Sequence, residues 1–128
     1  MPLLVKQLFL VAMGGALGAS SRYLVTLASA RWIGTAFPWG TLMVNLIGCF
    51  LYGLIFALLA KEWAWSLEAR LFLLTGFLGG LTTFSSFGAE TVLLGADGSG
   101  MAAMLNVAAN NAAGMGLVLL GLWIGKLF

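Results

Sequence analysis

The stretch of sequence that decides the fold is residues 71–94, which read LFLLTGFLGGLTTFSSFGAETVLL. It is long enough to cross the membrane as a helix, which takes about 20 apolar residues. Its centre holds the pair Gly79-Gly80, followed by hydroxyl side chains at positions 82, 83, 85 and 86. Each glycine disfavours helix by about 1 kcal/mol, and Ser and Thr hydroxyls compete for backbone hydrogen bonds. We therefore predict a transmembrane helix that is broken near mid-membrane, with a continuous, glycine-tolerant helix as the alternative.

The rest of the chain carries the same membrane signal. Its 128 residues are 62% apolar and 8% charged, whereas an average soluble domain is about 25% charged. Residues 7–30, 40–60 and 101–127 are also long and apolar enough to span a bilayer. We expect the first stretch to be a retained span and not a cleaved signal peptide, because its helical pattern continues to Ala30 and three more spans follow. The sequence predicts an all-α integral membrane protein, in which residues 1–128 form a single four-span domain.

Composition also excludes several classes of function. The chain has no His and a single Cys, which excludes the usual zinc, haem and His-based catalytic sites as well as a disulfide within one chain. Its net charge of +2 comes from scattered side chains, so no nucleic-acid-binding patch is expected. The remaining functions are those of a transporter, a channel or a membrane scaffold, and we do not expect an enzyme.

The charges at the span ends decide orientation only weakly. Four spans place both termini on one side, where four cations lie, while the opposite side has Arg31, with Arg22 just inside the membrane. The positive-inside rule favours cytoplasmic termini, but the bias is small enough to allow insertion both ways. The four cations are Lys6, Lys61, Arg70 and Lys126, and the tryptophans expected at the interfaces are Trp32, Trp39, Trp63, Trp65 and Trp123.

Glycines and one arginine mark the expected helix contacts. GxxxG pairs allow helices in lipid to approach closely, and the chain has three of them, at positions 14 and 18, 76 and 80, and 121 and 125. Arg22 lies on the same face as Gly14 and Gly18. Because an arginine inside the membrane costs about 2.5–3.5 kcal/mol, we expect it to point into the bundle or a wet vestibule. The alternative is that it snorkels to the interface.

Amides and hydroxyls form the second polar feature of the spans. Thr41 and Asn45 share one face of their span, and Asn106 and Asn110 lie one turn apart on another. With the hydroxyls of residues 82–86, they could form a track of hydrogen-bond donors for a small anion that must shed its water. The alternative is that the amides only hold the helices together.

Two phenylalanines and a carboxylate complete the set of candidates. Phe84 and Phe87 share one face of their helix, and the positive edge of an aromatic ring can stabilise an anion weakly. Glu90 lies one turn further along. It could repel or gate anions, bind a proton, or pair with Arg22, and the sequence alone leaves these roles open.

These residues fall in stretches that resemble the signature of the Fluc (CrcB-like) fluoride channel family. The stretches are residues 76–87 (GFLGGLTTFSSF) followed by Glu90, residues 14–18 (GGALG) with Arg22, and residues 38–45 (PWGTLMVN). Length, number of spans and the position of the helix break also match, so the resemblance covers nearly the whole chain. The departures are Gly88, Gly114 and the amides of Asn106 and Asn110, which stand where hydroxyl or aromatic residues are common in the family.

The resemblance implies a passive, fluoride-selective channel that exports fluoride across a bacterial plasma membrane. It implies an antiparallel, dual-topology homodimer with two pores and a structural sodium ion on the dimer axis, held by the backbone carbonyls of Gly79 and Thr82. It assigns Arg22 and Glu90 to the vestibule. The residues expected along the fluoride path are Thr41, Asn45, Phe84, Ser85, Phe87, Asn106 and Asn110.

Two other functions are compatible with four small spans. Proton-coupled small multidrug exporters are of this length and often insert both ways, but they carry an acid in the first span, where this chain has Arg22. A non-transporting subunit of a membrane assembly would use its buried amides only to hold helices together.

Overall fold

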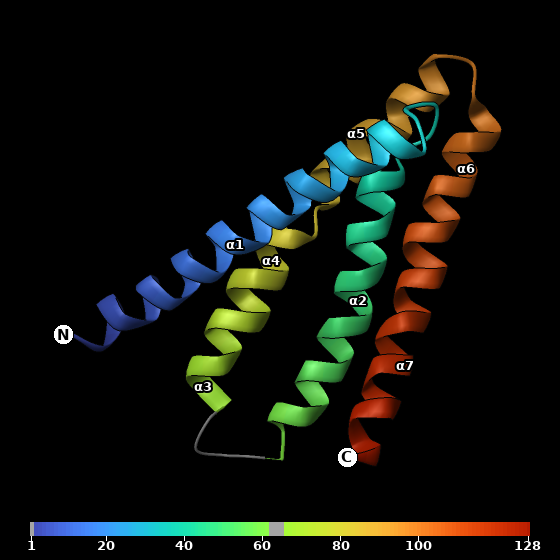
Figure 1. The fold of residues 1–128 in the computed structure, drawn as a ribbon. Helices are drawn as coiled ribbons and strands as arrows, with labels where there is room; N and C mark the ends of the chain where they lie inside the picture. Colours follow the sequence, from blue (N-terminus) through green and yellow to red (C-terminus); the bar gives the residue numbers. More distant parts are fainter. Residues whose placement is uncertain (1, 62–65) are drawn as a thin grey trace.

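The computed structural model describes residues 2–61 and 66–128, and within these ranges all the regular structure is helical (Figure 1). Four spans are long and apolar enough to cross a membrane: Leu3–Trp32, Trp39–Leu59, Leu67–Ala96 and Gly100–Leu127. The prediction of an all-α chain with four spans is confirmed. The first and third spans extend two to four residues beyond both predicted bounds, while the second and fourth differ from theirs by at most one residue. The interface tryptophans Trp63 and Trp65 lie outside the described residues.

The first two spans are single helices, whereas the third and fourth are composite. The first is α1 (Leu3–Trp32) and the second is α2 (Trp39–Leu59). The third comprises α3 (Ser66–Ala69), the π-helix η1 (Arg70–Leu78), α4 (Gly79–Leu81) and α5 (Phe84–Ala96). The fourth comprises α6 (Gly100–Ala108), the π-helix η2 (Ala109–Ala113) and α7 (Gly114–Leu127).

The irregular part of the third span lies just after its glycine pair. Gly79 and Gly80 are helical, within α4. Thr82 (φ −84, ψ 156) and Thr83 (φ −151, ψ 118) are extended, and α5 begins at Phe84. The glycine pair, which was expected to interrupt the helix, is helical, and the extended residues are the two threonines that follow it. Gly80 has a different use, since a Cβ there would lie 2.6 Å from the Gly15 carbonyl oxygen of α1.

Glycines bring α1 onto the third span, which it crosses in Figure 1. A Cβ on Gly14 would overlap the carbonyl oxygen of Phe72, and a Cβ on Gly18 would overlap that of Phe77. Gly76 faces Gly14 from the other side, where a Cβ would lie 3.0 Å from the Gly14 Cα. The predicted GxxxG packing of the first and third spans is confirmed, because backbone meets backbone at these positions.

Backbone contact at glycines also joins the second and fourth spans, which run side by side in Figure 1. A Cβ on Gly121 would overlap the carbonyl oxygen of Phe50, and a Cβ on Gly53 would overlap that of Val118. Between the two pairs of spans lies a small apolar core formed by Val44, Leu74, Leu78 and Leu81.

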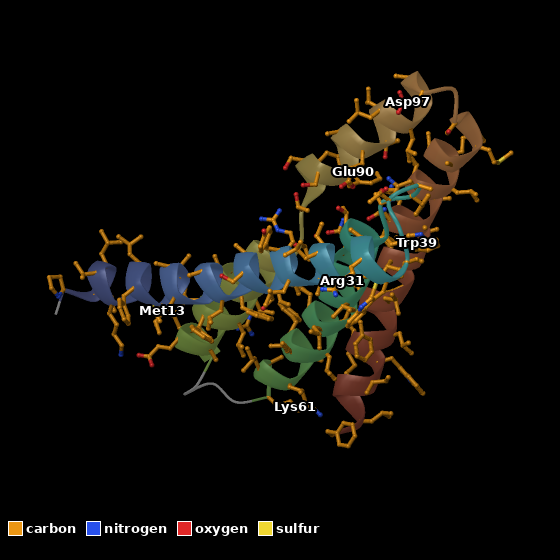
Figure 2. The ribbon with its side chains drawn as sticks, turned by 45° about the horizontal axis from the view of Figure 1, so that its top comes forward. Met13, Arg31, Trp39, Lys61, Glu90 and Asp97 are labelled. Carbon is orange, nitrogen blue, oxygen red and sulfur yellow. The ribbon has the colours of Figure 1, made fainter. Side chains whose placement is uncertain are left out.

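The two ends of the bundle differ in charge, as the sequence predicted. At one end the Lys6 ammonium bonds the Glu68 carboxylate, and Lys61 Nζ donates to the Lys126 carbonyl oxygen at 3.1 Å. Asp97 lies at the other end, away from Lys61 (Figure 2). Arg31 is in the last turn of α1, beside the connector into α2, whereas Lys61 follows the far end of α2. The end with Arg31 and Asp97 carries the two connectors that turn at Gly34 (φ 110) and Gly98 (φ 81).

Candidate functional site

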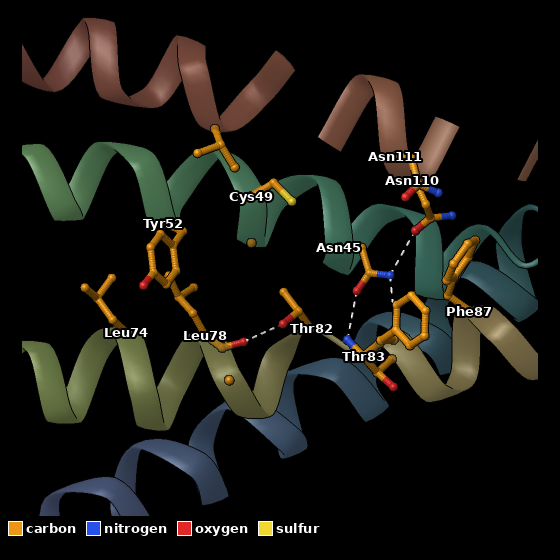
Figure 3. Close-up of a pocket in the computed structure, with 14 residues that line it drawn as sticks. Asn45, Cys49, Tyr52, Leu74, Leu78, Thr82, Thr83, Phe87, Asn110 and Asn111 are labelled. Carbon is orange, nitrogen blue, oxygen red and sulfur yellow. Dashed lines mark hydrogen bonds between the residues drawn. The ribbon is translucent and has the colours of Figure 1, made fainter. Parts of the chain in front are cut away.

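The extended threonines are held by a side chain from the second span. The Thr83 N–H donates to Asn45 Oδ1 at 2.8 Å, and Asn45 Nδ2 donates back to the Thr83 carbonyl oxygen at 3.2 Å (Figure 3). A peptide group buried without partners is costly. The Asn45 amide oxygen therefore replaces the hydrogen bond that the Thr83 N–H would have made in a continuous helix.

Hydroxyl groups gather at the point where the helix restarts. Thr83 is the N-cap of α5, and its side-chain oxygen accepts a hydrogen bond from the Ser86 N–H at 3.2 Å. The Thr83 hydroxyl also lies 3.2 Å from the hydroxyls of Ser85 and Ser86. This end of α5 carries the positive end of the helix dipole. Hydroxyls and dipole together make a local environment that favours negative charge.

The two phenylalanines predicted to share a face do so, but they are not equivalent. Their ring centroids lie 5.5 Å apart in an edge-to-face arrangement. The Phe84 side chain is 80% exposed, whereas Phe87 is only 8% exposed. Phe84 therefore presents its ring outward from the single chain, while Phe87 packs behind it.

Three asparagines form a continuous chain of hydrogen bonds across the spans. Asn45 Nδ2 donates to Asn110 Oδ1 at 2.9 Å, and Asn110 Nδ2 donates at 3.0 Å to both Oδ1 and the carbonyl oxygen of Asn106. Asn106 Nδ2 donates to the Thr91 hydroxyl at 2.9 Å, and that hydroxyl donates to the Phe87 carbonyl oxygen at 2.7 Å. The sequence analysis did not single out Thr91. Its one available signal was its place one turn beyond Phe87.

A cavity of about 330 Å³ lies between the second, third and fourth spans (Figure 3). Backbone and side chains of the predicted site border it. The lining includes Asn45, Gly79, Thr82, Thr83, Phe84, Phe87 and Asn110. The structure therefore brings together five of the predicted side chains and backbone groups with the extended threonines.

The predicted vestibule pair borders a second cavity, of about 270 Å³. Arg22, Thr41, Ser86 and Glu90 all contribute to its wall. Thr41 Oγ1 donates to Glu90 Oε1 at 2.8 Å, while Glu90 Oε2 is buried and lacks a hydrogen-bond partner within residues 2–61 and 66–128. Over the same residues no ion pair joins Arg22 to Glu90. Of the roles left open for Glu90, a direct pair with Arg22 is not the one found.

Comparison with known proteins shows the family to which this chain is related. Residues 9–122 match the family described as CrcB-like protein, Camphor Resistance. The chain belongs to the CrcB-like family. It is 47% identical over 116 residues to the fluoride-specific ion channel FluC of Rhizobium etli strain CIAT 652, covering 91% of this chain and 93% of that one. It is 45% identical over 124 residues to the protein of the same name from Hydrogenovibrio crunogenus, covering 97% and 94% of the two chains.

These comparisons confirm the resemblance seen in the sequence. A third relative, the fluoride-specific ion channel FluC of Legionella pneumophila strain Philadelphia 1, is 42% identical over 124 residues, covering 97% of this chain and 92% of its own. With its four apolar spans, this CrcB-like protein is a multi-pass bacterial membrane protein.

The CrcB-like chain also presents backbone oxygens at the interruption. In a continuous helix the Thr83 N–H would donate to the Gly79 carbonyl oxygen, but here it donates to Asn45. Within the described part of the chain, no hydrogen bond reaches the carbonyl oxygen of Gly79 or of Thr82. Free carbonyl oxygens of this kind suit a hard cation, which prefers oxygen ligands.

Proposed function

We propose that this CrcB-like protein is a passive, fluoride-selective ion channel that lets a bacterium discharge fluoride from its cytoplasm. The names of its relatives support this proposal. The observation that carries it is the edge-to-face pair of Phe84 and Phe87 beside the hydroxyl-rich start of α5. The ring edges offer an anion a weak positive potential and the hydroxyls offer it hydrogen-bond donors, without any basic side chain.

The chemistry of this surface suits a small, strongly hydrated anion. Hydroxyl donors at the start of α5, such as that of Ser85, can replace water lost by fluoride, and the edges of Phe84 and Phe87 add a weak attraction. The Thr41 hydroxyl already donates to Glu90, so its predicted place on the fluoride path would require that bond to open. Conduction requires binding that is favourable enough for entry but weak enough for release. Arg22 in the neighbouring cavity would raise the local concentration of anions before they enter, and Glu90 would oppose this effect.

A second copy of the chain is needed to complete the path. The Phe84 ring is 80% exposed in the single chain, and the cavity beside it opens on one side. We propose an antiparallel homodimer, inserted in both orientations, in which each copy closes the other's open cavity and two pores result. The placement of Asn45, Asn106 and Asn110 along these pores stays a prediction.

The Gly79 and Thr82 backbone fits the proposed structural sodium ion. Their carbonyl oxygens are free of hydrogen bonds within the described residues, and both residues border the same cavity. Because one chain offers few such ligands, a second copy would contribute the same oxygens. The bound ion would supply a fixed positive charge that holds the two copies together and neutralises backbone dipoles.

Fluoride efflux from liposomes tests the proposal. Purified protein is reconstituted into fluoride-loaded vesicles, and release is followed with a fluoride electrode after a potassium potential is set with valinomycin. Fast fluoride release, with little chloride release under the same potential, is expected. No release from vesicles with verified insertion would overturn the proposal. Transport of cationic dyes driven by a proton gradient would favour the small multidrug exporter instead.

A further inference from the structure

We propose that Asn110, Asn106 and Thr91 are positioning residues that hold the Thr83 peptide and the Phe87 turn in register, and do not themselves donate to the permeating ion. This inference rests on the proposed function for its flux readout alone. Its structural basis is the hydrogen-bond chain that runs from Asn45 to the Phe87 carbonyl oxygen.

The amide donors of this chain are almost all in use. A side-chain amide has two N–H groups. Those of Asn45 go to the Thr83 carbonyl oxygen and to Asn110, and those of Asn110 go to two oxygens of Asn106. An ion could take one of these donors only by breaking a bond that the protein already makes. We call the hydrogen-bonded set of Asn45, Asn110, Asn106 and Thr91 the brace. Because its donors are occupied, it supports the backbone and does not offer an ion a row of free donors.

Burial leads to the same conclusion for Asn106. Its side chain is 0% exposed, so a water-sized particle cannot touch it in the single chain. Fluoride is close to water in size, and covering the protein with a second copy would not uncover Asn106. This asparagine therefore acts on the site through its bonds to Asn110 and Thr91.

Each end of the brace bonds a group beside the proposed fluoride path. At one end, Asn110 holds Nδ2 of Asn45, the amide that pairs with the Thr83 peptide. At the other end, the Thr91 hydroxyl bonds the carbonyl oxygen of Phe87. Asn110 lies in the π-helical segment η2, and π-bulges are frequent at functional sites. The brace fixes where the extended threonines lie relative to the buried phenylalanine.

Hydrogen exchange at Thr83 tests the brace without using transport. Asn110→Leu removes the acceptor that orients Asn45, so exchange of the Thr83 N–H should accelerate about fivefold relative to amides elsewhere in α5. Asn111→Leu is the matched control: Asn111 lies on the same turn, but among the described residues its amide donates only to the Val107 carbonyl oxygen of its own span. Unchanged exchange at Thr83 in Asn110→Leu, or equal acceleration in both variants, would overturn the inference.

Fluoride efflux then distinguishes positioning from contact. The variants Asn110→Leu, Thr91→Val and the double variant are compared, with Thr91→Ser as the conservative replacement that keeps the hydroxyl. If Asn110 and Thr91 belong to one brace, their effects on the rate of fluoride efflux should be non-additive. The double variant should then be no slower than the slower single variant, and Thr91→Ser should match the wild type. Losses that multiply in the double variant would show independent contacts with the ion and overturn the inference.

The hydrogen-exchange and efflux experiments can fail independently, so failure of the brace is distinguishable from failure of the proposed function. If the wild type releases no fluoride, the proposed function fails and the hydrogen-exchange arm decides the brace alone. If Asn110→Leu does not yield folded protein, the same exchange measurement on Thr91→Val, with Thr91→Ser as its control, replaces it.

Discussion

At the scale of single residues, Asn45 shows how one amide can stabilise a break in a membrane helix. It accepts from the Thr83 N–H and donates to the Thr83 carbonyl oxygen. In lipid no water is present to satisfy these groups, so irregular backbone survives only where protein provides partners. Within residues 2–61 and 66–128, the Gly79 carbonyl oxygen is left free because the Thr83 N–H donates to Asn45, and that of Thr82 because the Ser86 N–H donates to the Thr83 hydroxyl.

Phe84 gives the sharpest prediction at this scale. We expect Phe84→Ala to slow fluoride efflux about tenfold, the upper effect of an aromatic contact of about 0.5–1.5 kcal/mol. The fold of each chain should be retained, because the ring is 80% exposed in the single chain, and thermal unfolding in detergent checks this. Phe128→Ala, at a ring that is 84% exposed at the chain end, is the control. Wild-type efflux from Phe84→Ala would remove this ring from the path.

Sequence could predict some of these contacts and not others. Phe84 and Phe87 are three residues apart in one helix, so their shared face follows from helical spacing. The bond from Asn106 to Thr91 joins two spans and depends on their relative rotation. Spacing within one helix does not give that rotation, which is why Thr91 escaped prediction.

At the scale of the elements, close helix packing and the interruption of the third span are separate features. Gly76 and Gly80 of the third span serve contact with α1, as Gly80 shows against the Gly15 carbonyl oxygen. The extended backbone instead occurs at Thr82 and Thr83, where Asn45 and the Thr83 hydroxyl provide new partners. Local propensity predicted an interruption at the glycine pair, which is helical in the structure. It could not locate the change, because the partners come from another span.

The packing role is tested at Gly18. A Cβ there would overlap the Phe77 carbonyl oxygen, so Gly18→Ala must push α1 away from the third span. We expect a melting temperature several degrees lower in detergent and a reduced yield of monodisperse protein. Gly95→Ala, at a helical position in α5 with no atom within 4 Å of the new Cβ, should be neutral or stabilising. Equal stability of the two variants would contradict backbone contact at Gly18.

The cap of α5 gives a second prediction at this scale. Thr83→Ala removes the oxygen that accepts from the Ser86 N–H, a loss typically worth about 1 kcal/mol. Thr83→Ser keeps this oxygen and should retain wild-type stability, measured by thermal unfolding in detergent. A Thr83→Ser variant as unstable as Thr83→Ala would show that the methyl group, and not the cap, is important.

At the scale of the whole molecule, the distribution of charge bears on assembly. The structure places Lys6 beside Glu68 and Lys61 beside Lys126, so these three lysines share the end that holds both termini. Arg31, in the last turn of α1 beside the start of α2, belongs to the opposite end. So small an imbalance leaves orientation weakly specified, which is the condition that an antiparallel dimer of identical chains requires.

Opposed charge variants test this assembly directly. Arg31→Gln should bias the chain toward cytoplasmic termini, and Lys61→Gln with Lys126→Gln should bias it the other way. Fusion reporters at the C-terminus measure the two orientations. In an antiparallel dimer a chain needs a partner in the opposite orientation. The fluoride efflux of each variant alone should therefore fall as the fraction of its chains in one orientation rises. Co-expression of the two variants should restore efflux, because each supplies the orientation that the other lacks. Full efflux from a variant found in one orientation only would rule out the antiparallel arrangement, while leaving the channel activity itself in place.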